Sequence, residues 1–295
     1  MRKSIAIIIT SILVLSGCNK QQSVSDRLLN EVEKAIAINP DSASNLLKSI
    51  SSPEKLDDKA FARWCMLSGK ITDEIFNSIL PTYQLERAYD WYSSHGSPDE
   101  QVQILIYLGR SYFADGDYDK AMSIYTNALD IAGKNKLNNL IGYTYDYIGD
   151  LYREKFMRTE AIKRYEIAAE YFKKEKNTDS YACALRDIGR EYAQMDSLSH
   201  ALNILIIADS VAANTSNINV TASINNALGN IYSMQNKYDK AEEYLLKALL
   251  TGREKMPDYV ALIDLYTASN SINKAKELLS LSLIHISEPT RPRLI

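Results

Sequence analysis

A strict repeat with a period of 40 residues constrains the fold of this chain more than any other feature. A glycine recurs at this interval, a tyrosine follows each glycine after three residues, and two alanines keep the same interval. The recurring positions are Gly109, Gly149, Gly189 and Gly229; Tyr112, Tyr152, Tyr192 and Tyr232; Ala121, Ala161, Ala201 and Ala241; and Ala128, Ala168, Ala208 and Ala248. A period of roughly 20 to 50 residues is typical of proteins that stack one structural unit many times.

The spacing inside each repeat predicts two helices. Leu108 precedes Gly109, as a large apolar residue precedes every glycine of the series, and the tyrosine lies on the same helical face. A short polar turn follows, and two alanines seven residues apart mark a second helix. Glycine inside a helix costs about 1 kcal/mol relative to alanine, so its recurrence indicates that the two helices cross closely. The absence of proline between Pro98 and Pro257 also favours an all-helical body.

This pattern resembles the tetratricopeptide repeat (TPR), a helix-turn-helix unit of about 34 residues. The match covers the small residue, the aromatic residue and both alanines of that motif over residues 99–280. A fifth unit follows at a shorter interval, because Ala275 lies 34 residues after Ala241. The resemblance implies an all-α fold, a right-handed α-solenoid whose concave wall is lined by the first helix of each repeat. The extra residues of each 40-residue unit are expected to lengthen the helices and the link between units.

Residues 26–95 are predicted to form N-terminal helical pairs that are a degenerate version of the same repeat. Gly69 and Ala88 lie 40 residues before glycine and alanine positions of the first strong repeat, whereas Pro81 replaces an expected alanine. Earlier, "NPDS" divides two helices, and Asp41 or Ser42 is expected to cap the second of them.

The first residues resemble a bacterial lipoprotein signal peptide. Two basic residues precede an apolar run over residues 5–15, which is shorter than the roughly 20 residues of a membrane span. The run ends in "LSGC", which is similar to the lipobox. The resemblance implies a signal peptide over 1–17, lipid on Cys18, a polar tether over 18–25, and a membrane-anchored protein of the cell envelope that faces the periplasm. An ordinary signal peptide with an incidental cysteine is the alternative.

No catalytic, metal-binding or cofactor-binding constellation is apparent in the sequence, and we expect a protein that is not an enzyme. His95 and His200 stand in turn-like or polar surroundings. Cys65 and Cys183 are expected to be small buried residues, although a disulfide between them is an alternative. The formal net charge of −3 argues against nucleic acid as a partner.

Candidate ligand positions follow from the resemblance, because the groove of TPR proteins is lined by set positions of the first helices. These positions are Tyr107, Arg110, Tyr143, Asp146, Tyr147, Asp150, Arg153, Arg186, Arg190, Asn226 and Asn230, with Phe113 and Asp187 beside them. Tyrosine, arginine and asparagine together suit an extended peptide, which needs flat apolar contact and hydrogen-bond partners. Solvated side chains that bind nothing are the alternative. The carboxylate clamp of chaperone-binding TPR proteins is not reproduced, because Ile106 replaces its lysine.

Three functions are compatible with these features. The leading hypothesis is a lipid-anchored scaffold that binds a protein or peptide partner through the groove. The second is the periplasmic sensor portion of a longer transmembrane TPR transcriptional regulator, whose membrane helix and output module are missing here. The third is a glycan-binding subunit of an outer-membrane nutrient importer, although the unbroken period argues against the insertions of such proteins.

The last fifteen residues, 281–295, do not continue the pattern. The fifth repeat predicts another turn of helix with a small residue around Ser282, whereas Ile284 and Ile286 prefer strands and Pro289 stops a helix. The stretch "LSLIHISEPTR" resembles translated sequencing-adapter DNA. We therefore expect a non-native tail on a chain that is cut inside its fifth repeat; a functional basic tail is the alternative.

Overall fold

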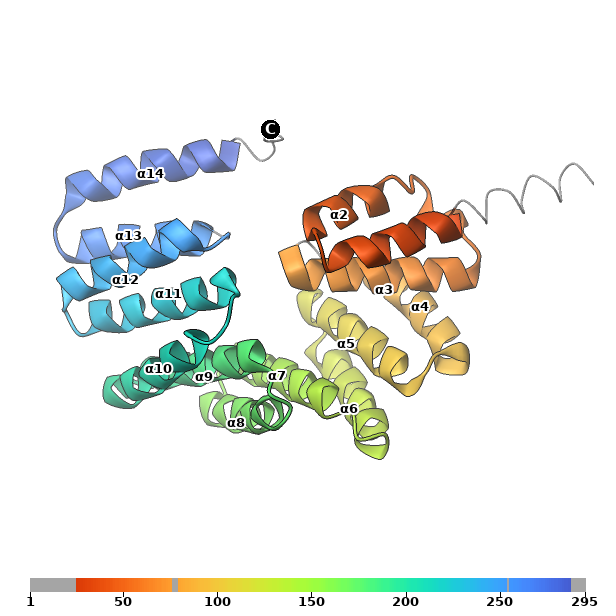
Figure 1. Ribbon diagram of the computed structural model, residues 1–295. Helices are drawn as coiled ribbons and strands as arrows, with labels where there is room; N and C mark the ends of the chain where they lie inside the picture. Colours follow the sequence, from red (N-terminus) through yellow and green to blue (C-terminus); the bar gives the residue numbers. More distant parts are fainter. Residues whose placement is uncertain (1–24, 76–78, 254, 288–295) are drawn as a thin grey trace, which may run out of the picture. The chain divides into compact units, whose positions relative to one another are not determined.

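The computed structural model describes residues 25–75, 79–253 and 255–287, which form helices joined by short turns (Figure 1). The predicted signal peptide, Cys18, most of the tether and residues 288–295 lie outside the described residues. Within the described part there is no strand, which confirms the all-α prediction. No described helix is long and apolar enough to cross a membrane.

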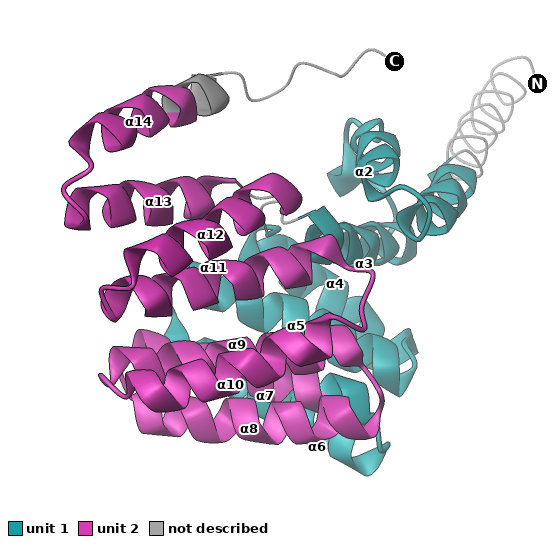
Figure 2. Cartoon of the chain, turned by 60° about the vertical axis from the view of Figure 1, so that its left-hand side comes forward, with its two compact units in different colours: residues 1–140 teal, residues 141–295 magenta. Residues whose placement is uncertain are grey.

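The chain divides into two compact units, Met1–Leu140 and Ile141–Ile295 (Figure 2). The first unit contains a helix over residues 25–36, then α2 (Pro40–Lys48), η1 (Pro53–Lys55), α3 (Asp58–Ile75), α4 (Thr82–His95), α5 (Pro98–Ala114) and α6 (Tyr118–Lys134). The unit boundary falls near the start of α7 (Asn138–Glu154). The second unit continues with α8 (Arg158–Lys174), α9 (Thr178–Gln194), α10 (Leu198–Ala212), α11 (Ile218–Met234), α12 (Tyr238–Thr251), α13 (Met256–Ala268) and α14 (Ile272–Ser287).

Helix length accounts for the 40-residue period. Helices α5 to α9 have 17 residues each, and three residues connect each of them to the next. Two such helices and two such turns fill one period. A 17-residue helix is about 25 Å long, at 1.5 Å per residue. The prediction that the extra residues lengthen the helices is therefore confirmed, but the connections stay short.

Every first helix from α5 onward ends in a Schellman motif, in which a left-handed residue turns the chain and its neighbour bonds back into the helix. The left-handed residues, with positive φ, are Gly116, Phe156, Asp196, Asn236 and Asn270. The next backbone N–H donates to the carbonyl of the recurring tyrosine or its equivalent: Tyr112, Tyr152, Tyr192, Tyr232 and Tyr266. Five equivalent turns therefore direct the chain from a first helix into a second one.

The recurring glycines provide the space for close helix crossing that the sequence predicted. A methyl group added at Gly149 would lie 2.5 Å from a ring carbon of Tyr165 on the next helix. The same contact joins Gly109 to the ring of Tyr125. In the two later repeats leucine replaces tyrosine, with Leu205 against Gly189 and Leu245 against Gly229. All eight alanines of the repeat are fully buried.

The N-terminal pairs depart from the repeat in two ways. The nearest neighbour of Gly69 on α3 is the ring of Tyr107 on α5, whereas the later repeat glycines meet a side chain of the next helix. Pro81 precedes α4 as its N-cap residue, so α4 begins later than the period implies. The cap predicted at Asp41 or Ser42 is wrong. Asn39 caps α2 by accepting a hydrogen bond from the Ser42 N–H at 2.9 Å, and Pro40 takes the first helical position.

The fifth repeat continues further than the sequence indicated. Helix α14 runs to Ser287, past the predicted end of the array at residue 280. Ser282 is 3% exposed, so the small residue expected at this position of the repeat is indeed buried.

Candidate functional site: a polar groove in the second unit

A groove of about 770 Å³ crosses four first helices of the second unit. Its walls come from α7, the start of α8, α9, α11 and α13. The lining side chains are Arg153, Glu154, Phe156, Arg158, Arg190, Glu191, Ala193, Gln194, Ala227, Asn230, Ile231, Ser233, Met234, Ala261 and Asp264. A cleft of this volume is in the usual range for ligand sites, roughly 300 to 1,000 Å³.

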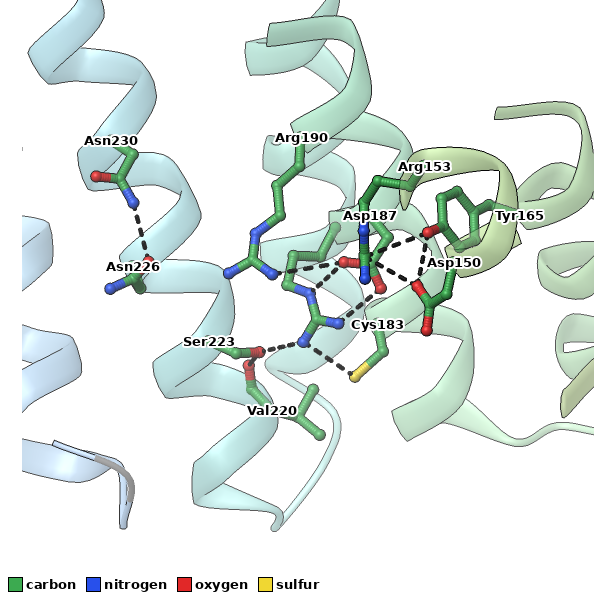
Figure 3. Close-up of polar contacts among 11 residues, drawn as sticks. Asp150, Arg153, Tyr165, Cys183, Asp187, Arg190, Val220, Ser223, Asn226 and Asn230 are labelled. Carbon is green, nitrogen blue, oxygen red and sulfur yellow. Dashed lines mark hydrogen bonds and ion pairs between the residues drawn. The ribbon is translucent and has the colours of Figure 1, made fainter. Parts of the chain in front are cut away.

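The repeat places acid, base and amide side chains at equivalent positions on successive first helices. One position holds Asp150, Arg190 and Asn230; the position four residues earlier holds Asp146, Arg186 and Asn226. Because adjacent first helices run side by side, opposite charges on α7 and α9 come close together. The result is a network of polar contacts that includes groove-lining residues (Figure 3).

Arg186 and Asp187 form the centre of this network. The guanidinium donates to both carboxylate oxygens, with distances of 3.0 and 2.6 Å, and also donates to Ser223 Oγ on α11 at 2.9 Å. Asp187 is 5% exposed. Burial raises the pKa of this carboxyl, but the attraction of Arg186 outweighs it and holds the pKa below its ordinary value. Arg186 therefore links α9 to α11 and does not line the groove.

A second pair lies on α7. Arg153 contacts Asp150 at 2.9 Å, and the Tyr165 hydroxyl donates to the same carboxylate at 2.7 Å. Burial raises the pKa of Asp150, and the opposing attraction of Arg153 does not fully reverse this. The Tyr165 ring that rests on Gly149 thus also holds Asp150, and with it the groove-lining Arg153.

Asp146 is the poorly satisfied member of the network. Its Oδ1 is buried and has no hydrogen-bond partner within the described part of the chain. Burial raises the pKa of Asp146 well above its ordinary value, and the nearby carboxylates Asp150 and Asp187 raise it further. Arg186 and Arg153 oppose this rise but do not cancel it.

Arg190 is the most exposed of the three arginines that line the groove. Its side chain is 41% exposed and lies 3.5 Å from an Asp187 oxygen that Arg186 already occupies. Burial and the neighbouring Arg186 lower the pKa of Arg190 to about 10. Its charge is therefore less well neutralised than that of Arg186.

A chain of amides forms the opposite wall. Asn226 Nδ2 donates to Asp258 Oδ1 at 2.7 Å, and Asn230 Nδ2 donates to Asn226 Oδ1 at 2.9 Å. Asn226 is 6% and Asp258 is 4% exposed. Asp258 thereby orients Asn226, which in turn orients the groove-lining Asn230.

The two predicted tyrosines of α7, Tyr143 and Tyr147, lie outside the groove. The Tyr143 hydroxyl accepts hydrogen bonds from Asn177 Nδ2 at 3.1 Å and Ser180 Oγ at 2.9 Å. Its ring meets Phe172 edge to face, with centroids 4.9 Å apart. Tyr143 therefore ties α7 to α8 and α9. Tyr147 is half-buried, and neither tyrosine lines the groove.

The predicted residues of the first unit do not form a comparable site. Tyr107 is 3% exposed, and its hydroxyl donates to Asp73 Oδ2 at 2.9 Å. Arg110 forms an ion pair with the same carboxylate, and Phe113 packs against Tyr118. Tyr107 lies in the core rather than on an open surface, because Gly69 leaves room for its ring. A cavity of only about 10 Å³ lies beside it, which is space for one water.

Of the predicted ligand positions, Arg153, Arg190 and Asn230 line the groove. Asp150, Arg186 and Asn226 do not line it but belong to the contacts that support it, whereas Asp146 does neither. The sequence did not reveal Phe156 and Met234, which also line it. Comparison of turn positions across repeats could have found Phe156, since the equivalent residues are glycine, aspartate or asparagine.

The histidines and cysteines have ordinary surroundings. His95 stacks on Trp91 with centroids 5.0 Å apart, and His200 stacks on Tyr192. Cys65 and Cys183 are free thiols, and burial raises the pKa of Cys65 to about 12. Within the described ranges, no cluster of histidine, cysteine, aspartate and glutamate could hold a metal ion.

Comparison with known sequences identifies the repeat. Two family profiles, both described as tetratricopeptide repeat, match residues 105–138 and 221–256. A curated relative, the photosystem I assembly protein Ycf3 of Rippkaea orientalis, is 32% identical over 91 residues. That match covers 30% of this chain, and it spans 52%, about half, of the relative.

Solved structures with a similar fold are distant in sequence. A Rap protein complexed with competence and sporulation factor has a TM-score of 0.70 at 19% identity, covering 86% of this chain and 74% of the other. BtubC from P. vanneervenii has a TM-score of 0.59 at 18% identity, covering 72% and 94%. At such identities the likeness concerns the fold. This chain therefore carries tetratricopeptide repeats and has the fold of TPR solenoid proteins.

Proposed function

We propose that this chain is a lipid-anchored protein of the cell envelope that binds an extended segment of a partner protein in the groove of its second unit. The single observation that carries the binding proposal is the groove of about 770 Å³, into which Arg190 and Asn230 present charged and amide groups. The anchor and the location rest on the first eighteen residues, above all on "LSGC" and Cys18. The protein acts without catalysis.

The groove suits a peptide for two reasons. Arginine and asparagine offer donors and acceptors that match backbone amides and carboxylates, while Phe156 and Met234 offer apolar contact. The buried contacts of Asp258 with Asn226, and of Arg186 with Asp187, hold the wall in place before a ligand arrives. Side chains that are oriented in advance lose less entropy on binding. A protein of similar fold was solved with a bound factor, which agrees with such a use of the fold.

The binding proposal is tested by panning the full chain against a random dodecapeptide library, followed by calorimetry on a selected peptide. We expect saturable binding that the double variant Arg190→Gln/Asn230→Ala weakens by roughly tenfold or more. Arg110→Gln is the matched control, because Arg110 takes the equivalent repeat position in the first unit. Failure to select any peptide, or equal binding by the double variant, would contradict the proposal.

The anchor is tested separately. In a Gram-negative host, Cys18→Ser should move the protein from the membrane fraction to the soluble fraction, since acyl chains supply the membrane affinity. An unchanged distribution would contradict lipidation at Cys18 and leave the groove proposal intact.

A further inference from the structure

Phe156 occupies a backbone conformation that disfavours it. It is the left-handed residue of the turn between α7 and α8, with φ +58°. The equivalent turn positions hold glycine, aspartate or asparagine, the residues that tolerate this region. A bulky side chain with positive φ is a genuine outlier. Nothing in the turn itself requires phenylalanine, because the same Schellman hydrogen bonds form in the other repeats.

The ring does not compensate for this strain by packing. Phe156 is 79% exposed, whereas Phe61 and Phe172 are nearly fully buried. The Arg158 guanidinium lies 5.8 Å from the Phe156 ring centroid, which is at the outer limit of a cation–π contact. Strained residues that contribute little to folding gather at functional sites. The ring lines the groove described above, which is where such a residue would act.

A second exposed apolar side chain lines the same groove. Met234, at the end of α11, is 47% exposed, and the buried Ile231 one turn earlier also lines the groove. Methionine adapts its shape to different partners. Phe156 and Met234 therefore each give the groove an exposed apolar contact.

The charges of the groove favour one carboxylate. Arg158 is paired with the buried Glu191 at 2.9 Å, and Arg153 with a carboxylate of α7 at the same distance. Arg190 has a longer contact of 3.5 Å with Asp187, whose nearer partner is Arg186. Arg190 can therefore donate a charge-assisted hydrogen bond to a further carboxylate.

Two exposed carboxylates limit how acidic a ligand can be. Glu154 and Asp264 also line the groove and would repel a segment with several negative charges. One negative charge in the ligand is thus attracted by Arg190, and additional ones are disfavoured.

We propose that the groove selects an extended partner segment that places large apolar side chains against Phe156 and against Met234 and a single carboxylate on Arg190. The inference rests on the peptide-binding function proposed above and adds the chemistry of the ligand. Phe156 is retained in an unfavourable turn because it contacts this segment.

The test uses the peptides selected by panning. We expect the enriched sequences to share leucine, isoleucine, methionine or phenylalanine together with one aspartate or glutamate. Phe156→Asn and Arg190→Gln should each weaken binding of such a fluorescein-labelled peptide by roughly tenfold. Replacing the acidic residue of the peptide by its amide should weaken binding to the wild type, but not to Arg190→Gln. Met157→Ala is the control, because Met157 is 47% exposed beside Phe156 and does not line the groove.

Stability measurements separate loss of contact from loss of fold. Phe156→Asn suits the left-handed turn, so its thermal unfolding should occur at the wild-type temperature or above it. If peptides bind but Phe156→Asn and Arg190→Gln leave their affinity unchanged, this inference is overturned and the proposed function stands. If no peptide binds the wild type, both fall.

Discussion

The two units build different surfaces from one repeat. In the first unit, Tyr107 and Arg110 both bond to Asp73, and the space beside them is a cavity of about 10 Å³. In the second, the position equivalent to Arg110 is Arg190, which opens into a groove of about 770 Å³.

The difference lies in what stands beside these positions. The first unit supplies one carboxylate, Asp73, close enough to occupy both polar side chains. The second unit distributes three arginines and three aspartates over α7 and α9, and Asp187 is shared between Arg186 and Arg190. A repeat fold therefore offers a binding surface where its arginines have fewer carboxylate partners than they could bond.

The largest expected effect on stability comes from breaking the ion pair between Arg186 and Asp187. Arg186→Ala leaves the buried Asp187 without its main partner, and should destabilise the second unit by about 3 kcal/mol. In the first unit, Arg110→Ala removes a partner of the half-exposed Asp73 and should cost less than about 1 kcal/mol. Hydrogen exchange along α9 and α11, compared with α3 and α5, measures each effect where it occurs. Similar losses in both variants would contradict the contrast between the units.

The next largest effect on stability is expected where a repeat glycine lets two helices cross closely. Gly149→Ala forces a methyl group into the Tyr165 ring, and should cost about 2 kcal/mol by overpacking. Gly133, at the end of α6, has open space around it, so Gly133→Ala should stabilise by about 0.5 to 1 kcal/mol through helix propensity. Urea titrations followed by circular dichroism compare the two. A neutral Gly149→Ala would show that the crossing can relax.

The stability of the second unit should also depend on pH, through the protonation of its buried aspartates. Because the folded pKa of Asp146 is raised, its contribution to stability is complete below its ordinary value of 3.8 and is lost as pH rises through the folded pKa. The pKa of Asp187 is lowered, so its contribution is present above 3.8 and is lost as pH falls below it. Wild-type stability should therefore rise as the solution is acidified from neutral pH toward 4, and then fall.

Asp146→Asn tests this pH dependence. The variant removes the buried charge and should be more stable than the wild type by about 1 to 2 kcal/mol at neutral pH. Its melting temperature should no longer rise on acidification, but should still fall at the lowest pH because Asp187 remains. A wild type that loses stability steadily from pH 7 to pH 4 is the contrary result.

The smallest effect concerns the turn residue. Phe156→Asn should stabilise the second unit by about 1 kcal/mol, because asparagine adopts positive φ more easily and the exposed ring loses no packing. The mirrored variant Gly116→Phe, at the equivalent turn of the first unit, should destabilise by a similar amount. Thermal melts of both variants and the wild type provide the check. A less stable Phe156→Asn would mean that the ring supports the fold.

Much of the fold was predictable because the small residues of the repeat stand where neighbouring helices come close together. The glycine and alanine positions required helix pairs that cross closely, and the contacts of Gly149 and the burial of Ala161 show that they do. The ends were less predictable. Asn39 rather than Asp41 caps α2, since Pro40 takes the first helical position and the cap is the residue directly before it.

The site was predictable in position but not in detail. Repeat register identified Arg190 and Asn230, because equivalent residues of a solenoid face the same way. Register could not show that Arg186 bonds its own neighbour Asp187, or that Gly69 admits the Tyr107 ring into the core. Those outcomes depend on which side chains meet in three dimensions.

The most direct test of the central claim is hydrogen exchange of the full chain with and without a peptide selected by panning. We expect the bound peptide to slow exchange at the ends of α7, α9 and α11, where Arg153, Arg190 and Asn230 lie, and to leave α3 and α5 unchanged. Slower exchange in α3 and α5, with none in the second unit, would show that the peptide binds elsewhere and would contradict the account.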